Sequence, residues 1–263
     1  MYPIFTIFGK EYSMYALMAV IGMLVSGFVF CRIIKKAGYN DNDAVLFLLV
    51  LAGGVLVGGS LLYGIVNIKN LELLTEVNTI GEALGVIGKT FGGSVFYGGL
   101  IAAIISGLLF IRAKKLPRAL YLDSSAILAP LFHAFARIGC FFGGCCYGIE
   151  SSIGFCAKGN NITDIGEVRR FPVQLLESGM NLIIAIIIML LAKKEKLKGR
   201  LFYLYLCLYA FIRFFDEFLR GDSVRGFLFG FSTSQLISII IEAIALFLLF
   251  FSIKKKSSDN LDK

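Results

Sequence analysis

The sequence predicts an all-α integral membrane protein with seven transmembrane helices, its N terminus outside and its C terminus in the cytoplasm. Three observations support this prediction. Of the 263 residues, 57% are hydrophobic and only 17% are charged, which is too little charge for a soluble chain of this length. Seven apolar runs approach the roughly 20 residues that a helix needs to cross a bilayer core. Basic residues are concentrated on alternate connections between these runs.

The apolar runs take up most of the chain and predict a single polytopic membrane domain over residues 1–263. The expected spans are 14–34, 44–66, 94–113, 124–142, 173–192, 201–219 and 234–253. The long connections between them are 67–93 and 143–172. The N terminus lacks the basic start and the cleavage site of a signal peptide, so the first span is expected to be retained.

The net charge of +8 is explained by membrane orientation rather than by nucleic-acid binding. Sixteen of the 26 Lys and Arg residues follow the first, third, fifth and seventh runs, within 32–36, 112–118, 193–200 and 254–263. Eight lie on the connections of the opposite side. This asymmetry is typical of the positive-inside rule and sets the expected orientation.

Two arginines lie inside expected spans. Arg137 comes late in the fourth run and Arg213 late in the sixth, so both are expected in the outer half of the membrane. A charge at membrane depth costs about 2.5–3.5 kcal/mol on insertion scales, so it generally has a partner or a function. One interpretation is a salt bridge of Arg213 with Asp216 or Glu217, three and four residues further along the helix. The other is an anion site, because guanidinium groups bind phosphate oxygens, which the outer leaflet presents as phospholipid headgroups.

Glycine-rich segments lie at the start of the third apolar run and at the end of the fourth. "FGGSVFYGGL" (91–100) opens the third run, and "ARIGCFFGGCCYG" (136–148) closes the fourth. Two interpretations are open for these glycines. They let backbone N–H groups approach an anion, or they let helices pack closely.

Six short segments, in order along nearly the whole chain, resemble the prolipoprotein diacylglyceryl transferase family. They are "SMYALMAVIG" (13–22), "VFYGGLI" (95–101), "ARIGCFFGGCCYG" (136–148), "FPVQLLES" (171–178), "YAFIRFFDEFLRGD" (209–222) and "STSQLISI" (232–239). The resemblance implies an enzyme that moves diacylglyceryl from phosphatidylglycerol to the cysteine thiol of a prelipoprotein signal peptide, with no cofactor and no metal. It also implies a multi-pass protein of the bacterial cytoplasmic membrane whose active site faces the outer leaflet.

The resemblance also implies roles for individual residues. Arg137 and Arg213 would stabilise the leaving phosphate, as preorganised positive charge does in a site of low dielectric constant. The residues implied to bind substrate or shape the pocket are Tyr15, Gly98, Gly99, Gly139, Cys140, Gly144, Cys145, Gly148, Gln174, Glu177, Tyr209, Glu217 and Arg220.

Departures from the family's pattern indicate a divergent, cysteine-rich paralogue. The family's histidine before Gly98 is Tyr97, and Phe171 replaces another histidine before Pro172. Cys140 and Gly143 replace asparagines, and Cys145 replaces a glutamate. The usual proton acceptor is therefore missing.

His133 is a candidate for the missing base. It lies four residues before Arg137, on the same face of the helix, and histidine titrates near neutral pH. The alternative is a structural histidine that is hydrogen-bonded between helices. Tyr97 is a poorer base, although its hydroxyl can donate a hydrogen bond to phosphate or substrate.

The clustered cysteines have four interpretations. Cys140, Cys145 and Cys146 are spaced as C-x4-C-C, and Cys156 follows ten residues later. They are packing residues, a disulfide, a nucleophile whose thiolate Arg137 favours, or a metal site. The spacing matches no common zinc finger, so packing or a disulfide is placed first and the nucleophile second.

Two further functions stay open beside thiol diacylglycerylation. One is the transfer of a glycerolipid or phosphoglycerol group to a non-protein acceptor. The other, from a different class of protein, is phospholipid binding without catalysis. Turnover of labelled phosphatidylglycerol distinguishes the enzymes from the binding protein.

Overall fold

The computed structural model confirms a mainly helical membrane protein and adds short strands that the sequence did not predict. The structure describes residues 4–75, 77, 79–156, 168–194, 197–221, 227–228 and 230–261. The chain divides into two compact units. One unit comprises residues 1–33 and 122–263, and the other comprises residues 34–121.

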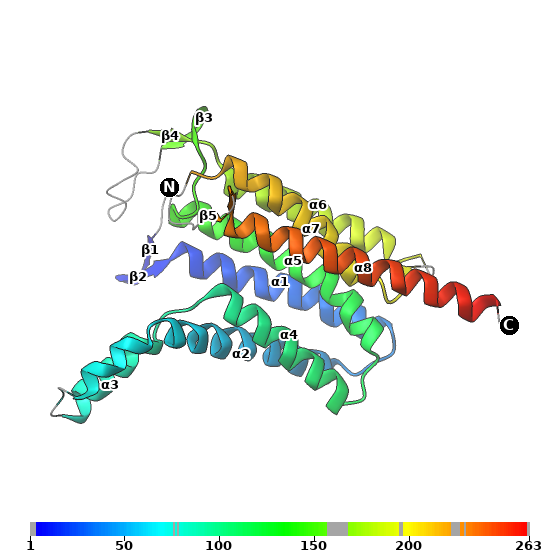
Figure 1. Cartoon of the computed structure of the whole chain (residues 1–263), viewed down its shortest axis with the longest axis horizontal. Helices are drawn as coiled ribbons and strands as arrows, with labels where there is room; N and C mark the ends of the chain where they lie inside the picture. The colour runs from blue at the N-terminus through cyan, green and yellow to red at the C-terminus, as the bar shows by residue number, and fades with distance from the viewer. Residues whose placement is uncertain are drawn as a thin grey trace. The chain divides into compact units, whose positions relative to one another are not determined.

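The larger unit is built from helices that run along a common direction (Figure 1). α1, α6 and α8 run one way, and α5 and α7 run the other (Figure 1). Alternating directions are what successive membrane spans require. The helices are α1 (Met14–Lys36), α5 (Arg118–Gly143), α6 (Val173–Leu191), α7 (Leu201–Asp216) with the 3-10 turn η3 (Glu217–Leu219), and α8 (Thr233–Leu261).

Short antiparallel strand pairs lie at the end of this unit where α1, α6 and α8 begin (Figure 1). In their registers Ile4 faces Ser13, Glu150 faces Arg170, and Phe227 faces Ser232. The strands are β1 (Ile4–Ile7), β2 (Lys10–Ser13), β3 (Glu150–Cys156), β4 (Arg169–Arg170), β5 (Phe227–Leu228) and β6 (Phe231–Ser232).

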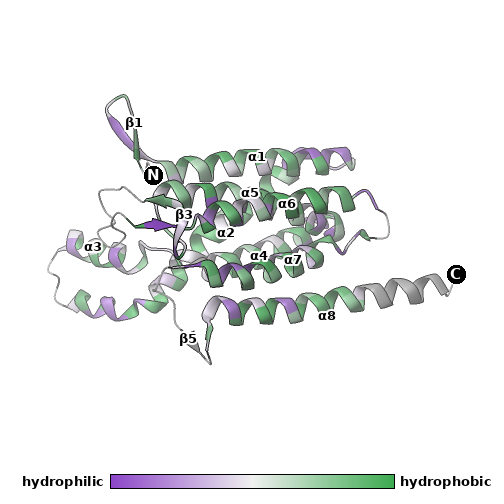
Figure 2. Cartoon of the chain, turned by 90° about the horizontal axis from the view of Figure 1, so that it is seen from above, coloured by the Kyte–Doolittle hydropathy of each residue, from purple (hydrophilic) through white to green (hydrophobic). Residues whose placement is uncertain are grey.

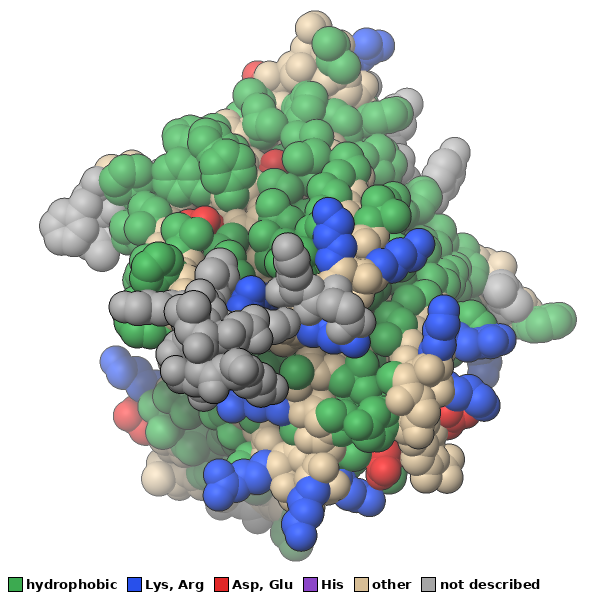
Figure 3. Space-filling model, turned by 90° about the vertical axis from the view of Figure 1, so that its right-hand side faces the viewer, with side chains coloured by type: hydrophobic (Ala, Val, Ile, Leu, Met, Phe, Trp, Pro, Cys, Tyr) green, Lys and Arg blue, Asp and Glu red, His purple; other side chains and the backbone are tan. Residues whose placement is uncertain are grey.

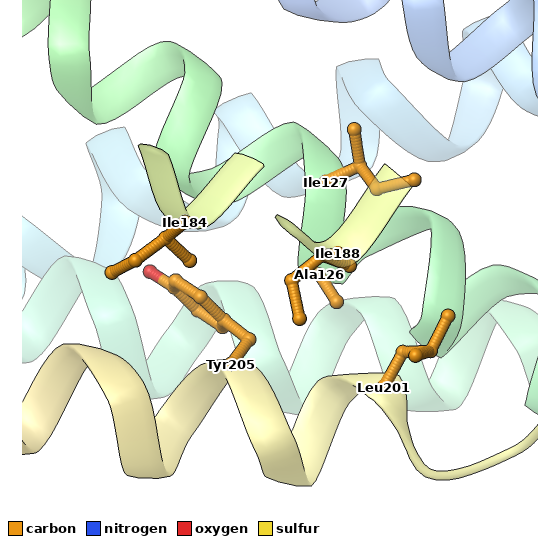
Figure 4. Close-up of a cluster of buried hydrophobic side chains, with 6 residues drawn as sticks. All are labelled: Ala126, Ile127, Ile184, Ile188, Leu201 and Tyr205. Carbon is orange, nitrogen blue, oxygen red and sulfur yellow. The ribbon is translucent and has the colours of Figure 1, made fainter. Parts of the chain in front are cut away.

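A hydrophobic cluster joins α5, α6 and α7 (Figure 4). Each of these helices contributes two buried side chains to it. Because lipid tails are as apolar as leucine, this cluster stabilises the bundle mainly through close packing rather than through removal of apolar surface from water. Its members are Ala126, Ile127, Ile184, Ile188, Leu201 and Tyr205.

Polar contacts fix the start of α7, the helix that carries Arg213. The carboxylate of Asp123 accepts hydrogen bonds from the backbone N–H groups of Gly199 (2.6 Å) and Leu201 (3.0 Å). These N–H groups at a helix start have no partner within the helix, so a side-chain acceptor satisfies them. Arg200 donates to the carbonyl oxygen of Ser252 in α8 at 2.7 Å. α7 is therefore tied to α5 and α8 at its first turn.

The smaller unit contains α2 (Asp41–Val66), η1 (Ile68–Thr75), α3 (Ile80–Phe91) and α4 (Phe96–Ala113). α2 and α4 approach most closely at Gly58 and Gly98, where a Cβ on either residue would overlap the carbonyl oxygen of the other. A Cβ on Gly99 would lie 2.8 Å from the carbonyl oxygen of Val55. These contacts support the helix-packing interpretation of Gly98 and Gly99.

The connection 67–93 contains regular structure that the sequence analysis left out. α3 begins with a capping box, in which the hydroxyl of Thr79 accepts from the N–H of Glu82 and the carboxylate of Glu82 accepts from the N–H of Thr79, both at 3.3 Å. This reciprocal pair satisfies two orphan donors and sets the start of the helix.

The helices agree with the expected spans in position but not all in length. Among the described residues, five are long and apolar enough to cross a membrane: Met14–Lys36, Asp41–Val66, Arg118–Gly143, Val173–Leu191 and Thr233–Ser252. The expected spans 94–113 and 201–219 correspond to a shorter apolar helix, Tyr97–Ala113, and to the 16-residue α7. The chain is a multi-pass membrane protein, and seven crossings with an outside N terminus stay predictions.

Polar side chains are unevenly distributed along the helices. Hydrophobic residues fill most of α1, α5 and α6, whereas hydrophilic residues gather near helix ends and in β2, beside the more hydrophobic β1 (Figure 2). Lys and Arg side chains gather on the face drawn in Figure 3, among hydrophobic ones. This distribution agrees with the charge asymmetry of the sequence.

Candidate functional site

Glu177 lies at the centre of a buried ion-pair cluster in the larger unit. Its carboxylate pairs with Arg137, and its Oε1 atom lies 3.8 Å from Nη1 of Arg213 and 3.9 Å from Nη1 of Arg220. The side chains of Glu177 and Arg220 are each only 4% exposed. Three arginines from α5, α7 and the segment after η3 thus converge on one carboxylate of α6.

Arg213 makes a second ion pair within its own helix. Its Nη2 atom lies 2.6 Å from Oε2 of Glu217, four residues further along. This confirms the predicted salt bridge between Arg213 and Glu217. Because a guanidinium group carries several N–H donors, the same side chain also reaches Glu177. Asp216 is buried nearby and interacts electrostatically with all three arginines.

Two hydrogen bonds fix the orientation of α6 about its axis and its position along α5. Ser178 donates through its hydroxyl to the carbonyl oxygen of Ala134 in α5 at 2.9 Å. Gln174 donates through Nε2 to the carbonyl oxygen of Cys145 at 2.8 Å. Together they hold α6 against α5 and against the loop that follows it, so Glu177 faces Arg137. The structure therefore places Glu177 against Arg137 and Gln174 against the loop after α5, and their roles in binding substrate stay predictions.

Gly148 lies where three backbone segments cross. Residues 147–149 pair with residues 219–221 through two N–H···O bonds of 3.0 Å, and the N–H of Phe171 donates to the carbonyl oxygen of residue 149 at 2.9 Å. A single β-bridge links Gly148 to Arg220. Because these bonds fix the backbone on both sides of Arg220, they hold its guanidinium group in the cluster.

Gly148→Ala is expected to lower stability by about 1–3 kcal/mol and to reduce activity. An added Cβ would lie 2.9 Å from the carbonyl oxygen of Leu219, and closer still to that of Phe171, so the segments must separate. Gly179→Ala in α6 is the matched control, because nothing lies within 4 Å of its added Cβ. Thermal unfolding and turnover of the two purified variants test this, and equal behaviour of the two would contradict it.

Arg170 belongs to this region, although the sequence analysis did not single it out. Its Nη1 atom donates to the carbonyl oxygen of Gly148 at 3.4 Å, and its Cζ atom lies 4.5 Å from the centre of the Tyr147 ring. Its Nη2 atom also lies 3.8 Å from Oε1 of Glu150. In the sequence it is one of several basic residues on a connection, and its only signal is its place directly before the "FPVQLLES" segment.

Tyr15 lies beside Gly139, where α1 packs against α5. A Cβ on Gly139 would lie 3.2 Å from Cδ2 and from the carbonyl oxygen of Tyr15. The glycine therefore allows a close approach of the two helices, which supports its packing interpretation. A role of Tyr15 and Gly139 in binding substrate stays a prediction.

His133 and Tyr209 lie side by side, with ring centres 5.3 Å apart. Each residue precedes an arginine of the cluster, Arg137 or Arg213, by four positions, which is about one helical turn. The structure thus brings these two predicted residues together between α5 and α7. Whether His133 acts as a base is a hypothesis that this contact leaves open.

Tyr97, Gly98 and Gly99 begin α4 and belong to the smaller unit. The side chain of Tyr97 is exposed. The role of these three residues in the site, which the resemblance implies, stays a prediction.

The three clustered cysteines gather where α5 ends. The sulfur atoms of Cys140, Cys145 and Cys146 all lie within 4.8 Å of one another. Arg137 donates through Nη1 to the sulfur of Cys140 at 3.9 Å. Gly144 turns the chain between them with a φ of +71°, a left-handed conformation that favours glycine. Among the described residues no cysteine forms a disulfide, so the disulfide alternative is not what the structure shows.

The fold and the cluster define a multi-pass membrane protein that holds converging guanidinium groups among its helices. The family described as prolipoprotein diacylglyceryl transferase matches residues 3–251, and the chain belongs to this family. Members of this family are transferases, which makes the chain an enzyme of that class.

Curated relatives agree with this assignment. The chain is 32% identical over 245 residues to the phosphatidylglycerol–prolipoprotein diacylglyceryl transferase of Clostridium tetani, covering 93% of this chain and 94% of the relative. It is 33% identical over 244 residues to transferase 2 of the same description from Clostridium perfringens, covering 89% of each. The relative from Geobacter sulfurreducens is 30% identical over 244 residues, covering 90% of this chain and 89% of the relative.

Proposed function

We propose that this protein transfers diacylglyceryl from phosphatidylglycerol to the cysteine thiol of a prelipoprotein signal peptide. The observation that carries the proposal is the convergence of Arg137, Arg213 and Arg220 on the buried carboxylate of Glu177. Family membership and the names of the relatives supply the substrate class.

The cluster has the chemistry that the leaving group needs. The acceptor thiolate attacks the glycerol carbon bonded to the phosphate oxygen, the C–O bond breaks, and the electron pair leaves on glycerol phosphate. Negative charge therefore grows on the phosphate, where guanidinium groups in a site of low dielectric constant stabilise it. Glu177 holds the three cations together, and guanidinium groups bind phosphate oxygens through their N–H donors.

The roles of individual residues form part of the proposal. Arg137 and Arg213 stabilise the leaving phosphate, and Arg220 stands at the mouth of the pocket. Gln174, Tyr209 and Glu217 orient the site, and His133 or Tyr97 receives the proton of the acceptor thiol. The resemblance to the family further implies substrate-binding roles for Tyr15, Gly98, Gly99, Gly139, Cys140, Gly144, Cys145 and Gly148.

The decisive experiment combines purified protein with labelled phosphatidylglycerol and a peptide that carries a lipoprotein signal cysteine. The expected result is diacylglyceryl on the peptide thiol together with an equal amount of glycerol phosphate. Consumption of phosphatidylglycerol without a labelled peptide would favour a paralogue with a non-protein acceptor. Binding without consumption would favour a non-catalytic phospholipid-binding protein.

We further propose that the chain crosses the bacterial cytoplasmic membrane seven times, with the site toward the outer leaflet. Five long apolar helices, together with the shorter α4 and α7, supply the seven segments. The basic connections after the odd-numbered spans support a cytoplasmic C terminus and an outside N terminus. The alternating directions of α1, α5, α6, α7 and α8 are compatible with this arrangement (Figure 1).

Thiol labelling of whole cells is expected to reveal this topology. In a variant without the six native cysteines, Ser152→Cys reacts with a membrane-impermeant reagent. Lys198→Cys reacts only after the cells are opened. Both positions are exposed, so access depends on the side of the membrane. The reverse pattern would put the arginine cluster toward the cytoplasmic leaflet and contradict the proposal.

A further inference from the structure

The three clustered cysteines where α5 ends are reactive side chains to which the proposed transfer chemistry assigns no step. The sulfur atoms of Cys140, Cys145 and Cys146 lie within 4.8 Å of one another as free thiols. Cys140 is buried and Cys145 is exposed, so the cluster opens from the end of α5 toward the outside of the larger unit.

The backbone folds back on itself to bring these sulfurs together. The N–H of Cys145 donates to the carbonyl oxygen of Cys140 at 3.2 Å, which closes a turn at the end of α5. Cys146 has a φ of +57°, a left-handed conformation that is uncommon for a residue with a side chain. Such strained conformations cluster at functional sites. Gln174 anchors the turn through the carbonyl oxygen of Cys145 at 2.8 Å.

We propose that Cys140, Cys145 and Cys146 bind one thiophilic divalent cation of the zinc class. Zinc–sulfur bonds are about 2.3 Å long, and a tetrahedral arrangement puts the sulfurs roughly 3.8 Å apart. The observed separations are all within 4.8 Å, so small side-chain rotations bring the three sulfurs to the ion. Three thiolate ligands leave one tetrahedral position for a water molecule or another external ligand.

The charge around the cluster fits this proposal. Binding releases three thiol protons, and a dication with three thiolates carries a net charge of −1. Arg137 lies 3.9 Å from the sulfur of Cys140 and offsets that charge.

Metal titration of the full-length protein in detergent tests the site without any activity measurement. The reduced, chelator-treated protein is titrated with Zn²⁺ and with Cd²⁺. Elemental analysis measures the bound metal, and ultraviolet sulfur-to-cadmium charge transfer reports the ligands. We expect one ion per chain. Cys145→Ser and Cys146→Ser each weaken binding by more than the roughly 10–100-fold that loss of an outer-shell partner costs.

Matched variants separate this site from other thiols. Cys31→Ser and Cys207→Ser, within α1 and α7, are expected to bind metal as the unmodified protein does. Because Cys140 is buried, the exposed Cys145 provides the decisive variant if Cys140→Ser fails to fold. Less than one ion per chain, or equal affinity in the Cys145→Ser and Cys31→Ser variants, would overturn the proposal. A reductant-sensitive mass loss of two protons without bound metal would instead identify a disulfide and overturn it as well.

Discussion

Replacing Arg137 with lysine is expected to slow diacylglyceryl transfer by about 10²–10³-fold, nearly as much as replacing it with alanine. Lysine keeps the positive charge beside Glu177 but presents a point charge instead of a planar fork of N–H donors. If Arg137 binds the developing phosphate charge, the lost fork lowers kcat. The measurement is turnover of labelled phosphatidylglycerol by purified variants whose elution and thermal unfolding match those of the unmodified protein.

Arg32→Lys is the control for this experiment. Arg32 is exposed in α1, with its guanidinium group 4.9 Å from the centre of the Phe28 ring, and it is expected to tolerate lysine. Arg213→Lys is expected to behave like Arg137→Lys. Near-normal turnover in folded Arg213→Ala would show that Arg213 serves only its ion pairs with Glu177 and Glu217. Near-normal turnover in folded Arg137→Lys would refute the phosphate role of that residue.

Glu177→Gln is expected to destabilise the protein by about 3–5 kcal/mol, because it removes the carboxylate that three buried arginines share. Glutamine has nearly the same shape, so the loss reflects charge rather than packing. The guanidinium groups then repel one another without their common counter-ion. Chemical or thermal unfolding in detergent measures the change, and the transfer rate is expected to fall with it.

Glu150→Gln is the matched control for Glu177→Gln. Glu150 pairs with Arg170 at 3.8 Å, but its side chain is 69% exposed. Exposed ion pairs contribute about 0–1 kcal/mol, so this variant is expected to unfold close to the unmodified protein. If Glu177→Gln were as stable as Glu150→Gln, the buried cluster would not hold the helices together.

The positions of the membrane helices were predictable because apolar runs are a local property of the chain. The run 173–192 became α6 (Val173–Leu191), and 44–66 became α2 (Asp41–Val66). The strands were not predictable, because β4 has only two residues and exists through its pairing with β3. α3 was missed because residues 67–93 were assigned only as a connection between spans. Thr79 and Glu82 nevertheless show the spacing of a capping box, which marks the start of a helix.

The sequence singles out the four residues of the ion-pair cluster, Arg137, Glu177, Arg213 and Arg220, but not their arrangement. The pair of Arg213 and Glu217 follows from a spacing of four residues on one helix. The convergence of three arginines on Glu177 depends on how α6 is rotated against α5 and α7, which Ser178 and Gln174 decide through contacts with distant segments. Arg170 resembled any other basic residue because its partners, Gly148 and Tyr147, are more than 20 positions away in the chain.

The shared carboxylate has a consequence for biogenesis, because the ribosome makes Arg137 before it makes Glu177. While α5 enters the bilayer, its guanidinium group has no counter-ion from α6, at an expense of about 2.5–3.5 kcal/mol. That expense is removed when α6 arrives, and the remaining cations join only with α7 and the segment that carries Arg220. A nascent chain halted between α5 and α6 therefore holds an unneutralised charge within lipid. The cluster is complete once the segment with Arg220 has been made, when only α8 (Thr233–Leu261) is left to insert.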